Sequence, residues 1–185
     1  PGRGYVRVVP MTPAVCMLDN QKSKKRKCIE GYALNISGLL PETSESECKT
    51  AASAVLSPLQ AKVVARVMPD ENSRIQLWHA IGGCVPMNAS QYFRTVINYA
   101  ERLKVPTELT SPENRTMHLT NLRLQFLRLN PAMPAGAIKF NCAAVKGTPI
   151  LAEVKLCYKP NGQYKQCSIA VETNCPNSFT IKGSY

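Results

Sequence analysis

The sequence predicts a single α+β domain, in which helices gather in the middle of the chain and an antiparallel sheet is built from both ends. The middle of the chain repeats apolar residues at helical spacing, whereas short β-branched or alternating runs occur near the two ends. A chain of 185 residues is long enough for one sizeable core. It contains no linker-like segment, internal repeat or bilayer-length apolar run. We therefore expect one domain over residues 1–185.

Five short runs are expected to form the strands of the sheet. They are YVRVV (residues 5–9), YALNI (32–36), AIKFNCA (137–143), ILAEVKLCYK (150–159) and QYKQCSI (163–169). The sequence KPNG joins the last two runs, and its Asn-Gly pair tolerates the positive φ of a tight turn. It therefore predicts a hairpin between them.

The stretch ISGLLP (residues 36–41) follows the second expected strand. We expect Gly38 and Pro41 to form a turn there, with Ser37 at the end of the strand. Catalytic residues often occupy such positions. A nucleophilic role for Ser37 is disfavoured, because a hydroxyl does not titrate near neutrality and no base is placed by sequence to activate it.

The expected helices follow in chain order. Residues 42–55 begin with Ser and Thr residues followed by acids, which is typical of a helix start. Residues 57–68 carry Pro just inside a Ser cap, and residues 73–84 end in two glycines. The clearest helix is 88–105, with a buried stripe of Tyr92, Val96, Tyr99 and Leu103. Residues 117–130 form a further candidate.

The eight cysteines are expected to have a role beyond packing in the core. None forms a C-x-x-C pair, and two histidines are too few for the common Cys/His zinc sets, so we expect neither a metal nor a cofactor. An even count fits four disulfides and an oxidising compartment, against the alternative of buried thiols in a cytosolic protein. We expect a secreted or periplasmic protein whose signal peptide is not part of this sequence.

The formal net charge is +11, and much of it lies between Cys16 and Cys28. This basic cluster consists of Lys22, Lys24, Lys25, Arg26 and Lys27. Such a cluster attracts RNA, anionic lipid or acidic polysaccharide through a salt-sensitive field. The alternative is a solvated charged loop that only aids solubility.

Several segments together resemble the ribonuclease T2 family, especially its bacterial members. ISGLLP resembles the first active-site motif H-G-L-W-P, and IQLWHAIGGC lies where the second motif, H-E-W-x-K-H-G-T-C, is expected. SQYF resembles the opening of the following helix, and PAVCML resembles the segment after the first strand. The most specific match is LAEVKLCYKPNGQYKQC, which contains the L-x-E-V-x-x-C strand.

The resemblance implies a ribonuclease T2-like fold, with a central antiparallel sheet, several helices and four disulfides. The implied pairs are Cys16–Cys28, Cys48–Cys84, Cys142–Cys175 and Cys157–Cys167. Sequence alone leaves every other pairing of eight cysteines open. The implied activity is RNA cleavage through a 2′,3′-cyclic phosphate, which uses two histidines with Glu and Lys as helpers.

The catalytic positions of both motifs are replaced in this sequence. The first-motif histidine falls on Ser37. In the second motif the His-Glu pair falls on Gln76 and Leu77, the lysine on Ala80 and the last histidine on Ile81. We therefore expect no catalytic residue at these positions. The scaffold residues Trp78, Gly82 and Cys84 agree with the motif, and Trp78 is expected to pack in the core rather than stack on a base.

Two functional hypotheses follow. The first is a catalytically inactive homologue reused as a binding module for a protein partner, or for RNA or another polyanion. The second is an active endoribonuclease with displaced residues, for which His79 is the fallback catalytic group. His118 is expected to be a surface residue at a helix start. The sequence does not predict the oligomeric state.

Overall fold

The computed structural model describes residues 3–11, 14 and 38–183. Six strands of this part form one sheet: β1 (Tyr5–Pro10), β2 (Gly38–Pro41), β3 (Arg115–His118), β4 (Ile138–Val145), β5 (Thr148–Tyr158) and β6 (Ser178–Ile181). The order is β2-β1-β5-β6-β3, and β4 pairs with the other side of β5. All pairs are antiparallel except β5–β6, which meet in parallel at Ile150 and Thr180. The sheet is therefore mixed, with an antiparallel majority.

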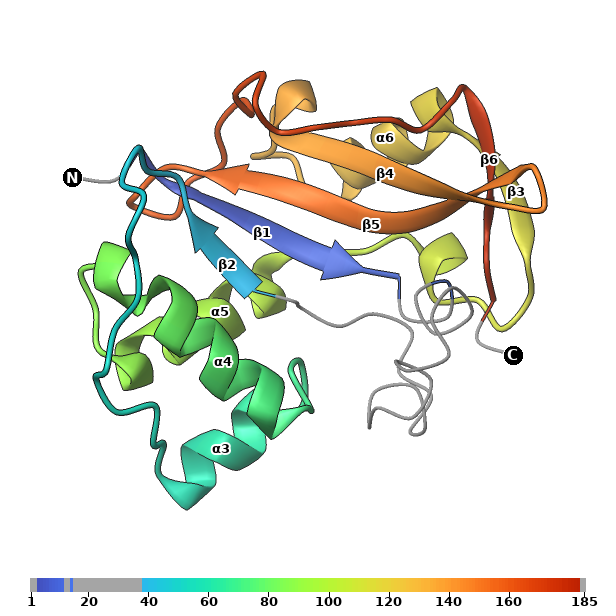
Figure 1. The fold of residues 1–185 in the computed structure, drawn as a ribbon. Helices are drawn as coiled ribbons and strands as arrows, with labels where there is room; N and C mark the ends of the chain where they lie inside the picture. The colour runs from blue at the N-terminus through green and yellow to red at the C-terminus, as the bar shows by residue number, and fades with distance from the viewer. Residues whose placement is uncertain (1–2, 12–13, 15–37, 184–185) are drawn as a thin grey trace.

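Between residues 38 and 183, four α-helices accompany the sheet: α3 (Pro58–Val64), α4 (Glu71–Ile81), α5 (Ala89–Arg102) and α6 (Leu119–Leu129). Figure 1 shows α3, α4 and α5 gathered on the β2 side of the sheet, whereas α6 lies by β4. The Phe126 ring of α6 lies 6.0 Å from the Phe140 ring of β4. The expected α+β fold is thus confirmed. No helix of the described residues is long and apolar enough to cross a membrane.

The helix starts follow local sequence signals. The Ser57 side chain accepts a hydrogen bond from Gln60 N–H, and Pro58 occupies the first turn of α3. Asn88 and Gln91 form a reciprocal capping box at the start of α5. The expected stripe of α5 is buried at Tyr92, Val96 and Tyr99, whereas Leu103 follows the helix end and is partly buried.

Residues 42–55 contain no helix, so this prediction is wrong. The Thr and Ser hydroxyls instead accept hydrogen bonds from the backbone two residues on. The N–H groups of Glu45, Ala52 and Val55 donate to Thr43, Thr50 and Ser53, respectively. Such local bonds compete with helical hydrogen bonding, and they leave this segment as an irregular loop.

Two further predictions differ from the structure. Gly38 and Pro41 belong to β2, paired with β1, and do not form a turn. Residues 163–169 form no strand: only Tyr164 makes an isolated bridge, to Tyr158. The turn at KPNG is present, with Gly162 at φ 90°. The strands β3 and β6 were not expected from the sequence, and the expected strand 32–36 lies outside the described residues.

Three disulfides join the described residues: Cys48–Cys84, Cys142–Cys175 and Cys157–Cys167. They are the pairs implied by the resemblance, and no described cysteine is free. Cys16 and Cys28 lie outside the described residues.

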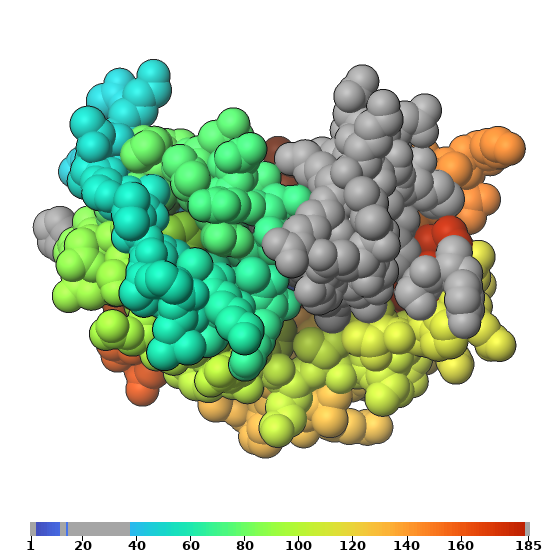
Figure 2. Space-filling view, turned by 90° about the horizontal axis from the view of Figure 1, so that it is seen from below, coloured from blue at the N-terminus to red at the C-terminus, as the bar shows by residue number. Residues whose placement is uncertain are grey.

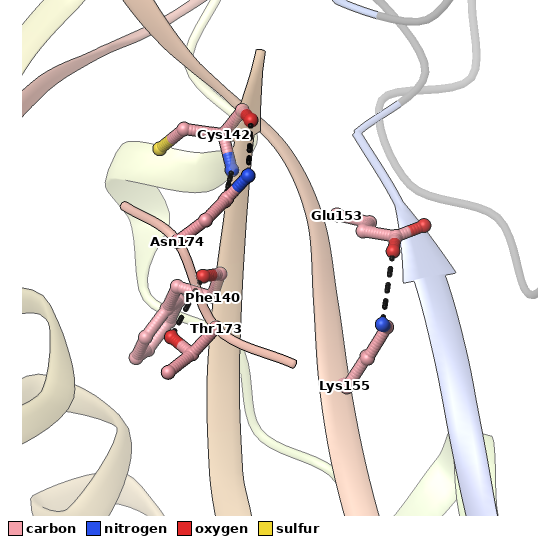
Figure 3. Close-up of polar contacts among 6 residues, drawn as sticks. All are labelled: Phe140, Cys142, Glu153, Lys155, Thr173 and Asn174. Carbon is pink, nitrogen blue, oxygen red and sulfur yellow. Dashed lines mark hydrogen bonds and ion pairs between the residues drawn. The ribbon is translucent and has the colours of Figure 1, made fainter. Parts of the chain in front are cut away.

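The Cys142–Cys175 bridge fixes the segment after residue 172 along the outer edge of β4 (Figure 3). Cys142 N–H donates to Asn174 Oδ1 at 2.7 Å, and Asn174 Nδ2 donates to Cys142 O at 3.1 Å. Thr173 Oγ1 donates to Phe140 O at 2.9 Å. On β5, Lys155 forms an ion pair with Glu153 at 3.5 Å. The segment therefore covers backbone groups that an open sheet edge would expose.

Candidate functional site

Helix α4 and strand β2 bring the two active-site motif segments together. A Cβ placed on Gly38 would lie 3.0 Å from Leu77 Cδ2 and 3.1 Å from its Cδ1. This is tighter than ordinary van der Waals contact, so the absence of a side chain at Gly38 lets the strand approach the helix. The glycine is required by this close approach, and not by a turn.

Two of the four motif positions on α4 face the core, and two face solvent. Leu77 and Ile81 are partly buried and pack against the core, whereas Gln76 and Ala80 are exposed. None of these four side chains transfers a proton at neutral pH. Ser37 lies outside the described residues, so the structure does not place the fifth motif position.

Of the scaffold residues of the motif, Trp78 is buried, whereas Gly82 and Cys84 are partly exposed. Trp78 is 2% exposed, and its indole N–H donates to Ala52 O at 3.0 Å. Its ring packs against Tyr92, with centroids 5.8 Å apart. The expectation that Trp78 packs in the core is confirmed.

Tyr92 is the only described ionisable side chain with a hydrogen bond to β2. Its hydroxyl donates to Leu39 O at 2.8 Å and accepts from Leu39 N–H at 3.0 Å. Burial raises the pKa of Tyr92 far above its usual range, and the Leu39 N–H opposes this only in part. The phenol therefore stays neutral, and both of its hydrogen bonds go to the backbone of Leu39. This suits a structural role.

His79 points away from β2. Leu77 contacts Gly38, and a residue two positions further along an α-helix is rotated by about 200°. The exposed His79 instead lines a cavity with the irregular loop at Ala54 and Val55 and with Phe93. The fallback residue thus lies on the face of α4 opposite Leu77, although Gln76, three residues earlier, is its neighbour along the helix.

His118 is remote from this site. It ends β3, at the opposite end of the strand order from β2, and it is exposed at the N-cap of α6. The expectation of a surface histidine at a helix start is confirmed. The two histidines of this protein therefore do not share one site.

The sequence did not reveal a buried arginine beside β2. Arg7 of β1 lies opposite Leu39 in the register and is 5% exposed. Its Nη1 donates to Tyr99 O at 2.9 Å and to the Tyr158 hydroxyl at 3.3 Å. Its Nη1 is thus bound within this aromatic cluster, whereas its Nε is buried without a hydrogen-bond partner among the described residues. At 5% exposure the guanidinium is closed off from a phosphate in solution.

A cavity of about 700 Å³ lies elsewhere, beside the end of α5. It is lined by Arg102 and Lys104, by residues 129–132 and by the turn at 162–164. The Tyr164 ring stacks on Tyr158, and burial raises the pKa of Tyr164 to about 12. Among the described residues, no group of three or more His, Cys, Asp or Glu could hold a metal ion.

The basic cluster at residues 22–27 lies outside the described residues, so the structure does not place these five cations.

No family model matches this sequence, and no curated protein matches it. Solved structures do resemble it. Ribonuclease MC1 from the seeds of bitter gourd has a TM-score of 0.73 and 18% identity, over 95% of this chain and 98% of that chain. The self-incompatibility-associated SF11-RNase of Nicotiana alata has a TM-score of 0.73 and 15% identity, over 97% of both chains. Japanese pear S3-RNase has a TM-score of 0.62 and 17% identity, over 97% of this chain and 99% of that chain.

These similarities span nearly the whole length of both proteins in each pair. The chain therefore has a ribonuclease T2-like fold, as the sequence predicted. At 15–18% identity they show the fold alone, and the bacterial character of the sequence stays a prediction.

Proposed function

We propose that this protein is a non-catalytic relative of the T2 ribonucleases, reused as a binding module. One observation carries the proposal: β2 and α4 meet at Gly38 and Leu77 as two motif segments should, yet the α4 motif positions hold only uncharged side chains. The scaffold is retained and the proton-transfer groups are absent from those positions.

The loss of the acid and the base should lower the rate of RNA cleavage by several orders of magnitude. A positioned acid or base contributes about 10²–10⁴-fold to a rate. Losing both removes on the order of 5–11 kcal/mol of barrier lowering if the two effects simply add. Such effects are not strictly additive, but no described side chain near Gly38 is placed to replace them.

The alternative is an active endoribonuclease that uses His79. Two observations weigh against it: His79 lies on the face of α4 that borders Val55, and His118 lies at the far end of the sheet. A single histidine also cannot supply both the acid and the base in one step.

A protein partner is favoured at the altered site, because Leu77, Ala80 and Ile81 replace ionisable residues with apolar ones. Polyanion binding has separate support from the five cations of the basic cluster. The three disulfides support an oxidising compartment. We infer a secreted or periplasmic protein.

The test is RNA cleavage by the pure protein between mildly acidic and neutral pH. We expect no turnover above that of a blank preparation. The matched variants are His79→Ala and His118→Ala, each of which removes one exposed histidine. Turnover that disappears in His79→Ala but persists in His118→Ala would establish the endoribonuclease and refute the binding module.

A further inference from the structure

A groove lies between α3 and α5 and has an apolar rim. We call it the α3–α5 groove and define it by Val55, Leu56, Leu59, Val63, Arg94 and Ile97, which are among the residues that line a cavity of about 470 Å³. In Figure 2 the loop and α3 (cyan to teal) lie on this face of the molecule, next to the green α4 and α5 region.

Two apolar side chains on this rim are unusually exposed. Val55 is 84% exposed and Leu59 is 74% exposed. Of the large apolar side chains in the described part of the chain, Ile169 in the loop after β5 is more exposed, at 104%, whereas Leu124 and Leu129 of α6 are 44% and 41% exposed. Adjacent exposed apolar residues beside a groove are typical of an interaction site, because burying them on binding is favourable.

The floor of the groove is held in a fixed shape. Gln60 Nε2 donates to Ser90 O at 2.7 Å, and Ser90 Oγ donates to Gln60 Oε1 at 2.9 Å. These two bonds join α3 directly to the first turn of α5. A groove that is already formed binds with a smaller entropic cost than one that must be assembled.

The charges around the groove are mainly positive. Arg94 lines it, and the exposed Lys62 and Arg66 lie on α3 and just beyond it. A second cavity of about 350 Å³ shares Val55 and Leu56 with the groove and adds the acidic Glu71 and the buried, cationic Arg74. The net charge of +11 adds a long-range field of the same sign. An acidic partner is therefore complementary.

We propose that the α3–α5 groove binds an acidic amphipathic helix of a partner protein. The helix would place its apolar face on Leu59, Val63 and Ile97 and its carboxylates near Lys62 and Arg94. The seven residues of α3 span about 10 Å, which matches roughly two turns of such a helix. The proposal rests on the binding role proposed above, and it places a protein partner at a second surface, apart from the altered motif positions.

The probes are two synthetic amphipathic peptides with the same leucines at helical spacing, one with Glu and one with Lys on its polar face. Binding is measured by methyl and amide NMR shifts of the intact protein. We expect saturable binding of the Glu peptide, with the largest shifts at Leu59, Val63 and Ile97. The Lys peptide should bind at least about tenfold more weakly.

The variants separate docking from folding. Leu59→Asp should weaken Glu-peptide binding at least about tenfold, whereas Leu124→Asp, an exposed leucine of α6, should leave it unchanged. The pair Lys62→Glu and Arg94→Glu should reverse the preference toward the Lys peptide. Equal loss in Leu59→Asp and Leu124→Asp, shifts outside the groove, or no binding of either peptide would overturn the proposal.

Two further measurements identify other outcomes. Concentration-dependent dimers that vanish in Leu59→Asp would assign the groove to a second copy of this chain and overturn the partner helix. RNA cleavage by the same preparations would refute the proposed function while peptide binding stands. Peptide binding that fails without any cleavage refutes only the groove.

Discussion

The Tyr92 hydroxyl donates to Leu39 O and accepts from Leu39 N–H, at 2.8 Å and 3.0 Å. Leu39 lies in β2, which ends the strand order of the described sheet, so these backbone groups have no further strand to pair with. A side chain of α5 thus provides hydrogen-bond partners for the N–H and C=O groups of one residue in an edge strand. It also fixes the helix layer to the segment that carries the first motif.

Replacing Tyr92 with Phe should destabilise the protein by about 2 kcal/mol, because it leaves a buried donor and a buried acceptor without partners. Tyr92 is fully buried, so water cannot replace the hydroxyl without rearrangement. Urea unfolding measures the change. Asn98→Ala, on the exposed face of the same helix, is the control and should not destabilise. An unchanged free energy of unfolding in Tyr92→Phe would show that the two hydrogen bonds do not stabilise the edge strand.

Four helices could be predicted because their signals are local. The Ser57 cap, the capping box at Asn88 and the apolar spacing all act within one or two turns. Residues 42–55, where the predicted helix is absent, carry the same residue types as a helix N-terminus. Their hydroxyls can accept hydrogen bonds from nearby N–H groups both at a helix start and in an irregular loop. The strands β3 and β6 escaped prediction because each has four residues and finds its partner about 60 residues away.

The motif positions could be predicted because spacing from Cys84 fixes them along α4. Their packing could not, since the approach of Gly38 to Leu77 depends on tertiary structure. The same holds for Arg7, whose hydrogen-bond partners Tyr99 and Tyr158 are 92 and 151 residues away. Val55 is exposed in an irregular loop where the sequence predicted a helix. The α3–α5 groove could therefore not be predicted from the sequence.

Restoring two of the three motif histidines, at Ser37 and Ile81, should restore little RNA cleavage. In the variant Ser37→His with Ile81→His, the helper positions still hold Leu77 and Ala80, so charge on phosphorus remains unstabilised. Adding Leu77→Glu and Ala80→Lys should raise the rate by a further factor of about 10² or more. Circular dichroism checks the folding of each variant. Robust cleavage by the double variant would contradict this account of the site.

RNA affinity should depend on the basic cluster and fall steeply with salt. Replacing Lys24, Lys25 and Arg26 with Gln should weaken binding and lower the slope of log K against log salt by about 2, since each phosphate contact on a single strand contributes about 0.7. Fluorescence anisotropy with a short single-stranded RNA measures both quantities.

The matched control replaces three cations elsewhere on the chain, Lys139, Lys146 and Lys159, with Gln. It changes the net charge equally, so it should lower affinity less than the cluster variant does. Equal effects of the two triple variants would indicate a general field in place of a local site.

Stability should fall with rising pH in the alkaline range. Burial raises the pKa of Tyr164 to about 12, whereas an unfolded tyrosine ionises near pH 10. The unfolded chain therefore releases this proton first, and the stability that the neutral phenol contributes is complete below about pH 10 and is lost as the pH rises to about 12. In Tyr164→Phe the decline over this window should be shallower, as measured by urea unfolding at several pH values. An unchanged decline would show that Tyr164 ionises equally in both states.

Removing the Cys48–Cys84 bridge should affect both stability and the α3–α5 groove. The bridge closes a segment of 36 residues, so the chain-entropy estimate for the double Ser variant is a loss of about 4 kcal/mol. The irregular loop that presents Val55 is tied by this bridge to the short 3-10 turn after α4 (Gly82–Cys84) and by the Trp78–Ala52 hydrogen bond to α4 itself. It has no helix of its own. Without the bridge the loop gains freedom that binding must remove, so Glu-peptide affinity should fall while the variant remains folded.

The matched control for this variant is Cys142→Ser with Cys175→Ser, which opens a segment of similar length, 33 residues, that runs from β4 through β5. It should cost similar stability, because the entropic term depends mainly on loop length. It should leave peptide affinity unchanged, because the α3–α5 groove is built from α3, α5 and the loop before them. If both variants lose affinity equally, the effect reflects global stability, and the loop does not preorganise the groove.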